Sequence, residues 1–273
     1  MKKRILSLGI IAVLFGALIG ASGCSKNLTY ANAEKYTAGG TTLTATVTDV
    51  EIEWLAGSVE FAYGDDEGIT FQETSATDLD KRTTLYYWLE NTTLHIKFAQ
   101  SRIGWWKGAY PEKDLVVTLP KDLVLREAEV DTTSADIDLN NLSARSIEAD
   151  SSSGAITGVL SDVTKELNVE ALAGSIDITA SGLQKFDIET TSTDVKLSVG
   201  TVLSEGSFDS VSGNFTLTLP ETFEGFSVEF ESVSGNFNSD FTTEKRGNRY
   251  VYGTGATELE VENTSGNVNV KKG

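Results

Sequence analysis

The sequence has few of the residues on which most redox and catalytic sites depend. It contains one cysteine, one histidine and three prolines. A single cysteine excludes an intramolecular disulfide. The single histidine, His95, leaves a catalytic triad or a zinc cluster at most one imidazole, and its place in the alternating run 94–98 predicts an ordinary surface residue. We therefore predict no catalytic residue, no metal site and no cofactor, and we expect the protein not to be an enzyme.

Basic residues are scarce as well. The chain carries 22 Lys and Arg against 40 Asp and Glu, which gives a net charge of −18. A nucleic-acid-binding surface needs a basic footprint, so the composition argues against a nucleic-acid partner. It also argues against attachment to anionic lipids through charge. The balance favours a solvated, self-repelling exterior.

Only one long apolar run is present, at residues 5–19, and it follows a basic head at 2–4. The run is short for a membrane span of about 20 residues and is typical of an export signal. Small residues then lead to Cys24. This arrangement resembles the lipobox of bacterial lipoproteins, although Ala21 stands where that motif usually has Leu. An uncleaved anchor helix and a fortuitous cysteine are the alternatives.

These features divide the chain into three parts. Residues 1–23 are expected to be a lipoprotein signal peptide, 24–39 a polar tether and 40–273 a single β-repeat domain. The lipobox resemblance implies that Cys24 carries acyl chains such as palmitate, and each methylene buried in lipid contributes about 0.8 kcal/mol to anchoring. We expect an extracytoplasmic protein that is held through Cys24 on the outer face of the cytoplasmic membrane.

Long helical periodicity is absent, and one short phrase recurs instead. It consists of a small residue, a turn pair, a polar residue and alternating apolar positions, as in the run Ser212 to Leu217. Successive copies are 19, 20, 19, 20, 22 and 31 residues apart. Their lead residues are Ser134, Ser153, Ala173, Ser192, Ser212, Ser234 and Ser265. A nearly constant period is typical of stacked units that cannot bury a core alone. A further, displaced copy stands at 56–61.

Each unit of about 20 residues has room for two strands with one apolar and one polar face. The sequence therefore predicts an all-β fold, a parallel β-solenoid or β-helix with two strands per coil, and right-handed because parallel crossovers usually are. Successive units would lie in register one on another, so that Ile137, Ile176 and Val195 share one continuous core. A propeller or a plain sandwich built from the same two-strand units stays open as an alternative.

The last and longest step contains an additional segment at 242–255. We interpret it as an inserted hairpin that turns near Gly247 and Asn248. Because an open solenoid end exposes unpaired strand edges, the expected role of the hairpin is to cover part of the terminal coil.

The turn positions of the repeat form a predicted column of small and amide residues. They are Gly154, Gly174, Gly213, Gly235, Gly266, Asn214, Asn236 and Asn267. Gly and Asn tolerate the positive φ that a sharp corner requires, and stacked amides can share hydrogen bonds along the column. We favour this structural interpretation over a row of ligand-binding groups.

All four tryptophans precede residue 111, and the loop that follows residue 101 concentrates three aromatic residues. Trp105, Trp106 and Tyr110 are candidate binding residues, because an exposed aromatic loop can stack on a sugar ring or enter a partner's pocket. The alternative, which we favour, is a cap that closes the N-terminal end of the core. Acid pairs such as Asp136 and Asp138 follow automatically from acidic outward faces, so they do not indicate a glycosidase.

The run 115–120, the recurring Ser-Gly-x-apolar phrase and the closing run 255–270 resemble the bacterial DUF4097 family of candidate adhesins with β-strand repeats. The resemblance covers roughly residues 40–271 and supplies no catalytic residues. It implies an extracytoplasmic domain with an adhesive or envelope-associated role. We accordingly expect a lipid-anchored surface protein that binds a glycan or protein ligand or serves as a scaffold. An envelope-stress sensor or regulator that binds a membrane protein is one alternative, and a carbohydrate-active β-helix enzyme is another.

Overall fold

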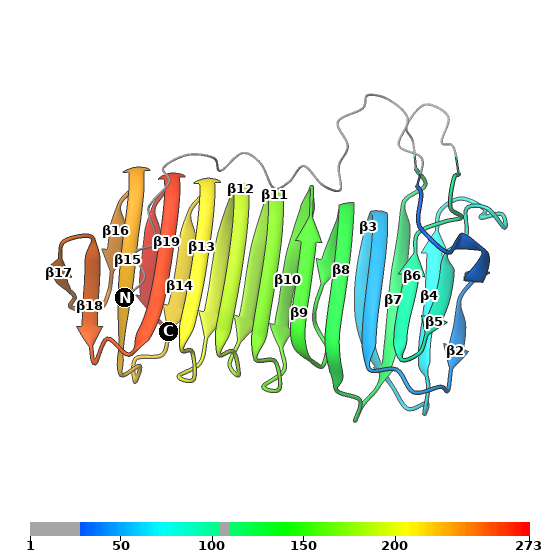
Figure 1. Cartoon of the computed structure of the whole chain (residues 1–273), viewed down its shortest axis with the longest axis horizontal. Helices are drawn as coiled ribbons and strands as arrows, with labels where there is room; N and C mark the ends of the chain where they lie inside the picture. Colours follow the sequence, from blue (N-terminus) through cyan, green and yellow to red (C-terminus); the bar gives the residue numbers. More distant parts are fainter. Residues whose placement is uncertain (1–27, 104–109) are drawn as a thin grey trace.

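A computed structural model describes residues 28–103 and 110–273. The described chain forms one long stack of strands, with the N-terminal elements at one end and the hairpin before the last coil at the other (Figure 1). The predicted signal peptide, Cys24, Trp105 and Trp106 lie outside the described residues. Within that part of the chain, no helix has the length and apolar character needed to cross a membrane.

Strands account for nearly all of the regular structure, together with one 3-10 turn at Ala33–Lys35. The strands are β1 (Thr37–Ala38), β2 (Thr41–Leu43), β3 (Asp49–Gly64), β4 (Ile69–Ser75), β5 (Tyr86–Glu90), β6 (Thr93–Lys97), β7 (Lys113–Pro120), β8 (Leu125–Asp138), β9 (Ala144–Ser151), β10 (Gly154–Leu160), β11 (Glu166–Ala180), β12 (Lys185–Val199), β13 (Glu205–Ser212), β14 (Phe215–Leu219), β15 (Gly225–Ser234), β16 (Phe237–Ser239), β17 (Glu244–Arg246), β18 (Arg249–Gly253), β19 (Thr257–Ser265) and β20 (Val268–Lys272).

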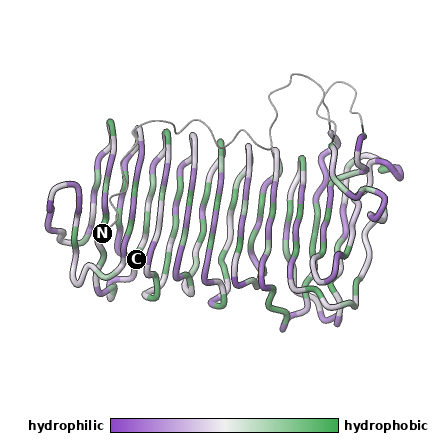
Figure 2. Tube along the Cα trace, in the orientation of Figure 1, coloured by the Kyte–Doolittle hydropathy of each residue, from purple (hydrophilic) through white to green (hydrophobic). Residues whose placement is uncertain are grey.

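The coils stack in parallel, as the repeat predicts. Ile156 of β10 pairs with Ile176 of β11, which pairs in turn with Val195 of β12 and, beyond it, Phe215 of β14. Polar and apolar residues alternate along most of the stacked strands, and Figure 2 shows this alternation from coil to coil. Equivalent positions therefore lie directly above one another, and each period of about 20 residues in the sequence forms one coil of the stack. The hand of the coil stays a prediction.

The core is a single apolar column that runs through the stack. Ile137, Ile176 and Val195 are at most 1% exposed and belong to one contiguous cluster of buried side chains. Burial of one such side chain contributes about 1.5–3 kcal/mol. This confirms the solenoid and rules out the propeller and the sandwich, in which these residues would lie in separate compartments.

The order of the coils departs from the order of the sequence at both ends. The last coil, β19 and β20, lies between the coil of β13 and β14 and the coil of β15 and β16. Likewise β3 lies between β8 and the pair β6 and β7. The expectation that successive windows simply follow one another is therefore wrong for the terminal coils. The inserted coils gain strand partners on both edges, which protects strands near the chain ends from fraying.

Antiparallel strands and aromatic side chains close the N-terminal end. β5 pairs with β6, and β4 pairs with β7. Trp54 is 1% exposed and meets Phe98 edge to face, with 4.9 Å between the ring centroids. Residues 28–38, within the range predicted as a tether, also dock here: β1 pairs with β5, and the Tyr30 hydroxyl donates to the carbonyl oxygen of Ala99 over 3.0 Å. The cap interpretation fits the described aromatic residues.

The inserted hairpin closes part of the C-terminal end. β17 and β18 are joined by the predicted turn at Gly247 and Asn248, and β18 pairs antiparallel with Gly225–Glu229 of β15. Tyr252 of β18 packs against Phe226 and Phe241, both at most 2% exposed. The hairpin thus covers the first half of the terminal coil, as expected from the sequence, and leaves the second half uncovered.

Candidate binding cleft at the C-terminal end

The cleft exists because the hairpin stops halfway around the terminal coil. The last contact of the hairpin backbone with β15 is the amide of Phe230, which donates to the carbonyl oxygen of Asn248 over 3.0 Å. Beyond that point, the only described strand that pairs with β16 is β20 on its inner side. The outer edge of the coil from Glu231 to Ser239 therefore borders an open space rather than another strand.

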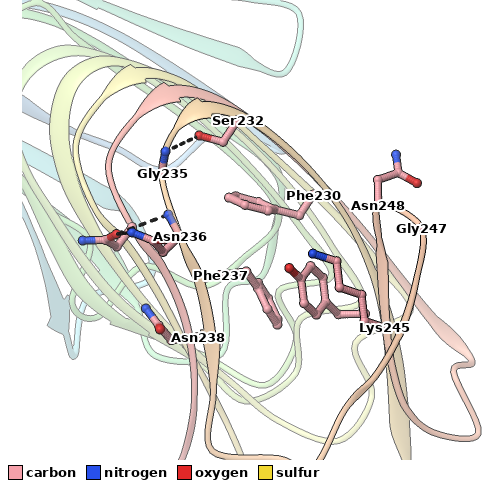
Figure 3. Close-up of a pocket in the computed structure, with 11 residues that line it drawn as sticks. Phe230, Ser232, Gly235, Asn236, Phe237, Asn238, Lys245, Gly247 and Asn248 are labelled. Carbon is pink, nitrogen blue, oxygen red and sulfur yellow. Dashed lines mark hydrogen bonds between the residues drawn. The ribbon is translucent and has the colours of Figure 1, made fainter.

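This space is a cleft of about 860 Å³ (Figure 3). Its lining residues are Phe230, Ser232, Gly235, Asn236, Phe237, Asn238, Lys245, Gly247, Asn248, Tyr250 and Asn267. They come from the terminal coil, the hairpin and the corner of the inserted last coil. A concave apolar surface with a few convergent polar groups is the usual form of a ligand-binding site.

Three half-buried aromatic rings form the floor of the cleft. The ring centroids of Phe237 and Tyr250 are 4.2 Å apart, and Phe230 lies 6.0 Å from Phe237 and 6.4 Å from Tyr250. Phe230 and Phe237 occupy the columns of Val261 and Val268 in the adjacent coil, where both valines are at most 3% exposed. The cleft floor is therefore the end of the apolar core.

Amide side chains form one wall, and most of them belong to the turn column. The Asn236 amide donates to Asn267 Oδ1 over 3.2 Å, the Asn267 backbone amide donates to Asn214 Oδ1 over 3.1 Å, and the Asn214 side chain donates to Asp194 over 3.0 Å. Asn214 and Asn236 are thus not in adjacent coils, because Asn267 lies between them. Asn236, at the open end of this series, lines the cleft, and no described residue donates a hydrogen bond to its side-chain oxygen.

The turn glycines line up at the same corner. Gly154 pairs with Gly174, and Gly266 lies between Gly213 and Gly235 in the stack. At Gly213 the backbone has φ +134°, and a Cβ atom there would lie 2.1 Å from the carbonyl oxygen of Thr193. A side chain is therefore excluded both by backbone strain and by contact with the neighbouring coil.

Of the candidate binding residues named from the sequence, Trp105 and Trp106 lie outside the described residues, and Tyr110 does not line the cleft. Tyr110 lies at the N-terminal end, where its half-buried ring meets Phe98 edge to face over 6.4 Å, and burial raises the pKa of its hydroxyl. His95 is on the polar face as predicted, but its side chain is only 13% exposed because it stacks against Trp88. The aromatic residues of the cleft were missed because their alternation is that of ordinary core residues.

A second feature is an unbroken column of carboxylates on the outer face of the first strands. In stack order this acidic column contains Glu53, Asp131, Asp150, Glu170, Glu189, Asp209, Glu262 and Glu231. At its N-terminal end Lys97 Nζ lies 2.6 Å from Glu53 Oε1 and 2.9 Å from Glu51 Oε1. No group of three or more described Asp, Glu, His or Cys side chains converges as a metal site would require.

Stacking like charges changes their ionisation. Burial, and then the charge of Asp150, raises the pKa of Asp131 to about 7. Burial and Glu170 raise the pKa of Asp150 to about 7, and burial and Glu262 do the same for Asp209. The column therefore holds carboxyl groups that gain protons near neutral pH, because burial disfavours the charged form and each ionised neighbour disfavours the next negative charge.

Comparison with known proteins identifies the family. The model of the family described as Toastrack DUF4097 matches residues 47–203 and, in a second overlapping match, 123–271. The chain belongs to the Toastrack DUF4097 family. The two matches overlap over the central coils, as a repetitive fold allows. No curated protein matches the chain.

Solved structures with some similarity to this Toastrack chain come from three bacteria. A candidate cell adhesion protein from Clostridium sporogenes is 18% identical, with a TM-score of 0.38, and the match covers 88% of this chain and 100% of the other. A candidate adhesin from Bacteroides fragilis is 13% identical, with a TM-score of 0.47 and coverage of 88% and 97%. A candidate lipid-binding protein from Parabacteroides distasonis is 14% identical, with a TM-score of 0.41 and coverage of 86% and 96%.

Proposed function

We propose that this Toastrack protein is a lipid-anchored cell-surface binding protein that takes up a glycan in the cleft at the C-terminal end of the solenoid. The observation that carries the proposal is the exposure of the core as three clustered rings, those of Phe230, Phe237 and Tyr250, in a cleft of about 860 Å³. Elsewhere along the stack, the residues of the same columns are buried between coils.

The chemistry of the lining suits a sugar ring. Aromatic rings offer flat, rigid apolar surfaces at a low cost in conformational entropy, and the apolar face of a pyranose can lie on them. Around the rings, the amides of Asn236, Asn238 and Asn248 use their nitrogens in hydrogen bonds to neighbouring side chains. Their side-chain oxygens can then accept hydrogen bonds from sugar hydroxyls.

The position of the cleft suits a surface receptor. Leu28 forms a bridge with Ile103 at the N-terminal end of the stack, whereas the cleft is at the opposite end. From β6 to β15 the described stack contains nine coils, both ends included, so eight spacings of about 4.8 Å give a length of about 38 Å. If Cys24 carries the lipid, the solenoid holds the cleft at the end away from the anchor. We infer binding or adhesion, rather than catalysis, as the activity of this arrangement.

The test is binding of the purified protein to a glycan array, followed by titration with the best oligosaccharide. Phe237→Leu removes a ring face but keeps the side chain apolar, and we expect it to weaken binding at least ~10-fold, as loss of an aromatic anchor does. Tyr63→Leu is the matched control, because Tyr63 is 41% exposed on a different coil. Its affinity should equal that of the unmodified protein.

Two other outcomes would replace the proposal. Capture of a specific membrane protein, with no glycan bound, would identify a sensor or regulator. Release of reducing sugar from a cell-wall or plant polysaccharide would identify an enzyme. A thermal melt of each variant separates loss of binding from loss of folding.

A further inference from the structure

The cleft has an unusual charge for a protein with this composition. The chain carries 40 acidic and 22 basic residues, yet among the described residues no carboxylate lines the cleft, and Lys245 is the one charged residue of that lining. Glu229 and Glu231 belong to the outward-facing positions of β15, where both accept hydrogen bonds from the side-chain nitrogen of Asn248, over 3.0 and 3.2 Å, whereas Phe230 between them lines the cleft. The cleft therefore lacks the acidic character of the exterior.

Lys245 differs from the two arginines of the same hairpin. Arg246 pairs with Glu244 over 2.7 Å, and Arg249 pairs with Glu229 over 2.7 Å. Lys245 forms no ion pair with any described carboxylate, and its ammonium group lies 4.9 Å from the centroid of the Tyr250 ring. In Figure 3 its side chain lies on the cleft side of the hairpin, facing Phe230 and Phe237. An unpaired cation thus lies beside the aromatic floor.

We propose that Lys245 selects sugars that carry a negative charge, an inference that rests on the glycan-binding function proposed above. An anionic substituent on a pyranose stacked on Phe237 and Tyr250 would meet the ammonium group at the edge of the rings. Charge-assisted hydrogen bonds are about twice as strong as neutral ones. A carboxylate, as in a uronic acid, and a sulfate share this chemistry.

The acidic exterior restricts how such a sugar is presented. A long polyanion lying along the solenoid would meet the acidic column and be repelled. The cleft, by contrast, is at the end of the stack and can admit the terminus of a glycan chain. The preferred ligand is therefore an oligosaccharide with a terminal acidic sugar, rather than the interior of a polyanionic polymer.

The experiment compares matched pairs of oligosaccharides on the full-length protein by calorimetry. Each pair differs only in its terminal sugar: glucuronic acid or glucose in one pair, and sulfated or unsulfated galactose in the other. The unmodified protein should bind the acidic member about 10-fold more tightly. Lys245→Gln should abolish the preference by lowering affinity for the acidic member about 10-fold, and Lys245→Arg should restore it. The preference should also shrink at high salt, since screening weakens exposed charge pairs.

The matched control is Lys272→Gln. Lys272 also lies over an aromatic ring, 5.2 Å from the centroid of Phe241, but it does not line the cleft. The Lys272→Gln variant should therefore keep the preference for the acidic sugar unchanged. Equal affinity for both members of each pair, or a preference that persists in Lys245→Gln, would overturn the role of Lys245 while leaving glycan binding intact. Failure to bind any glycan would instead overturn the proposed function itself.

Discussion

At the scale of single residues, the corner glycines set the spacing between coils. Gly213 has φ +134°, and its missing side chain allows the backbone of Thr193 to approach. Gly213→Val should therefore destabilise the fold by about 1–3 kcal/mol through strain, with an additional cost of contact. For a chain of this size that corresponds to a decrease of several degrees in melting temperature.

The control for this substitution is Gly247→Asn. Gly247 also has positive φ, at +69°, but nothing lies within 4 Å of a Cβ atom built there. Asn tolerates this left-handed conformation, so the melting temperature should hardly change. Calorimetry or circular dichroism measures both variants. Equal melting temperatures for Gly213→Val and the unmodified protein would show that the corner does not need glycine.

At the scale of elements, the position of the last coil predicts which strands can be cross-linked, and this differs from what the order of the sequence would predict. In the structure Ser207 of β13 pairs with Glu260 of β19, and Glu260 in turn pairs with Glu229 of β15. A Ser207→Cys, Glu260→Cys protein with Cys24→Ser should form a disulfide, because adjacent strands lie about 4.8 Å apart. The pair Ser207→Cys, Glu229→Cys should not, because two strand spacings exceed the about 7 Å that a disulfide can span.

Mass spectrometry of the oxidised proteins, before and after reduction, measures both cross-links. The second pair is the matched control, since it uses the same residue types on the same outward face. A cross-link between positions 207 and 229, with none between 207 and 260, would mean that the coils follow the order of the sequence.

Much of the fold can be predicted from these elements because the information is local and repeated. The alternation around Ile176 and Val195 predicts the strands, and the turn glycines predict the corners between them. The inserted segment 242–255 predicts the hairpin. The order of the terminal coils is different. Every coil presents nearly the same pattern of side chains to its neighbours, so any coil could stack on any other. No local signal in the sequence places β19 between β13 and β15.

The binding cleft could not be predicted for the same reason. Phe230 and Phe237 have the spacing and the apolar character of core residues, and in most coils the equivalent positions are buried. Their exposure follows only from the place of their coil at the end of the stack. One available signal was composition, because Phe and Tyr are concentrated between residues 226 and 252. The more conspicuous aromatic signal in the sequence is the loop with Trp105 and Trp106, which points to a binding site outside the C-terminal coils.

At the scale of the whole molecule, the acidic column destabilises the stack of coils that forms it. Parallel, in-register packing buries the apolar faces, but it also aligns the outward carboxylates about 4.8 Å apart. Burial first, and then the charges of these neighbours, raise the pKa values of Asp131, Asp150 and Asp209 to about 7, well above their ordinary value of 3.8. The folded protein therefore binds protons that the unfolded chain does not hold at the same pH.

The stability of the protein should accordingly rise as the solution becomes mildly acidic. A carboxyl group whose pKa is raised by folding stabilises the fold fully below its unfolded pKa, and this contribution is lost as pH rises through about 7. We expect the melting temperature to increase by several degrees between pH 7.5 and pH 5. Burial alone would raise the pKa of Glu51, but Lys97 and His95 lower it below its ordinary value. Glu51 therefore gains a proton only below this pH window. The window also lies below the pKa of about 8 to which burial lowers Lys113.

A single substitution in the column tests the origin of this pH dependence. Asp150→Asn removes one charge from the middle of the acidic column, so it should raise the melting temperature at pH 7.5 and flatten its dependence on pH. Asp66→Asn removes the same charge from an exposed turn outside the column and should leave the dependence unchanged. Added salt should stabilise the unmodified protein more at pH 7.5 than at pH 5, because screening acts on charges that are present only at the higher pH. A melting temperature that falls steadily from pH 7.5 to pH 5 would mean that the stacked carboxylates do not repel one another as the geometry requires.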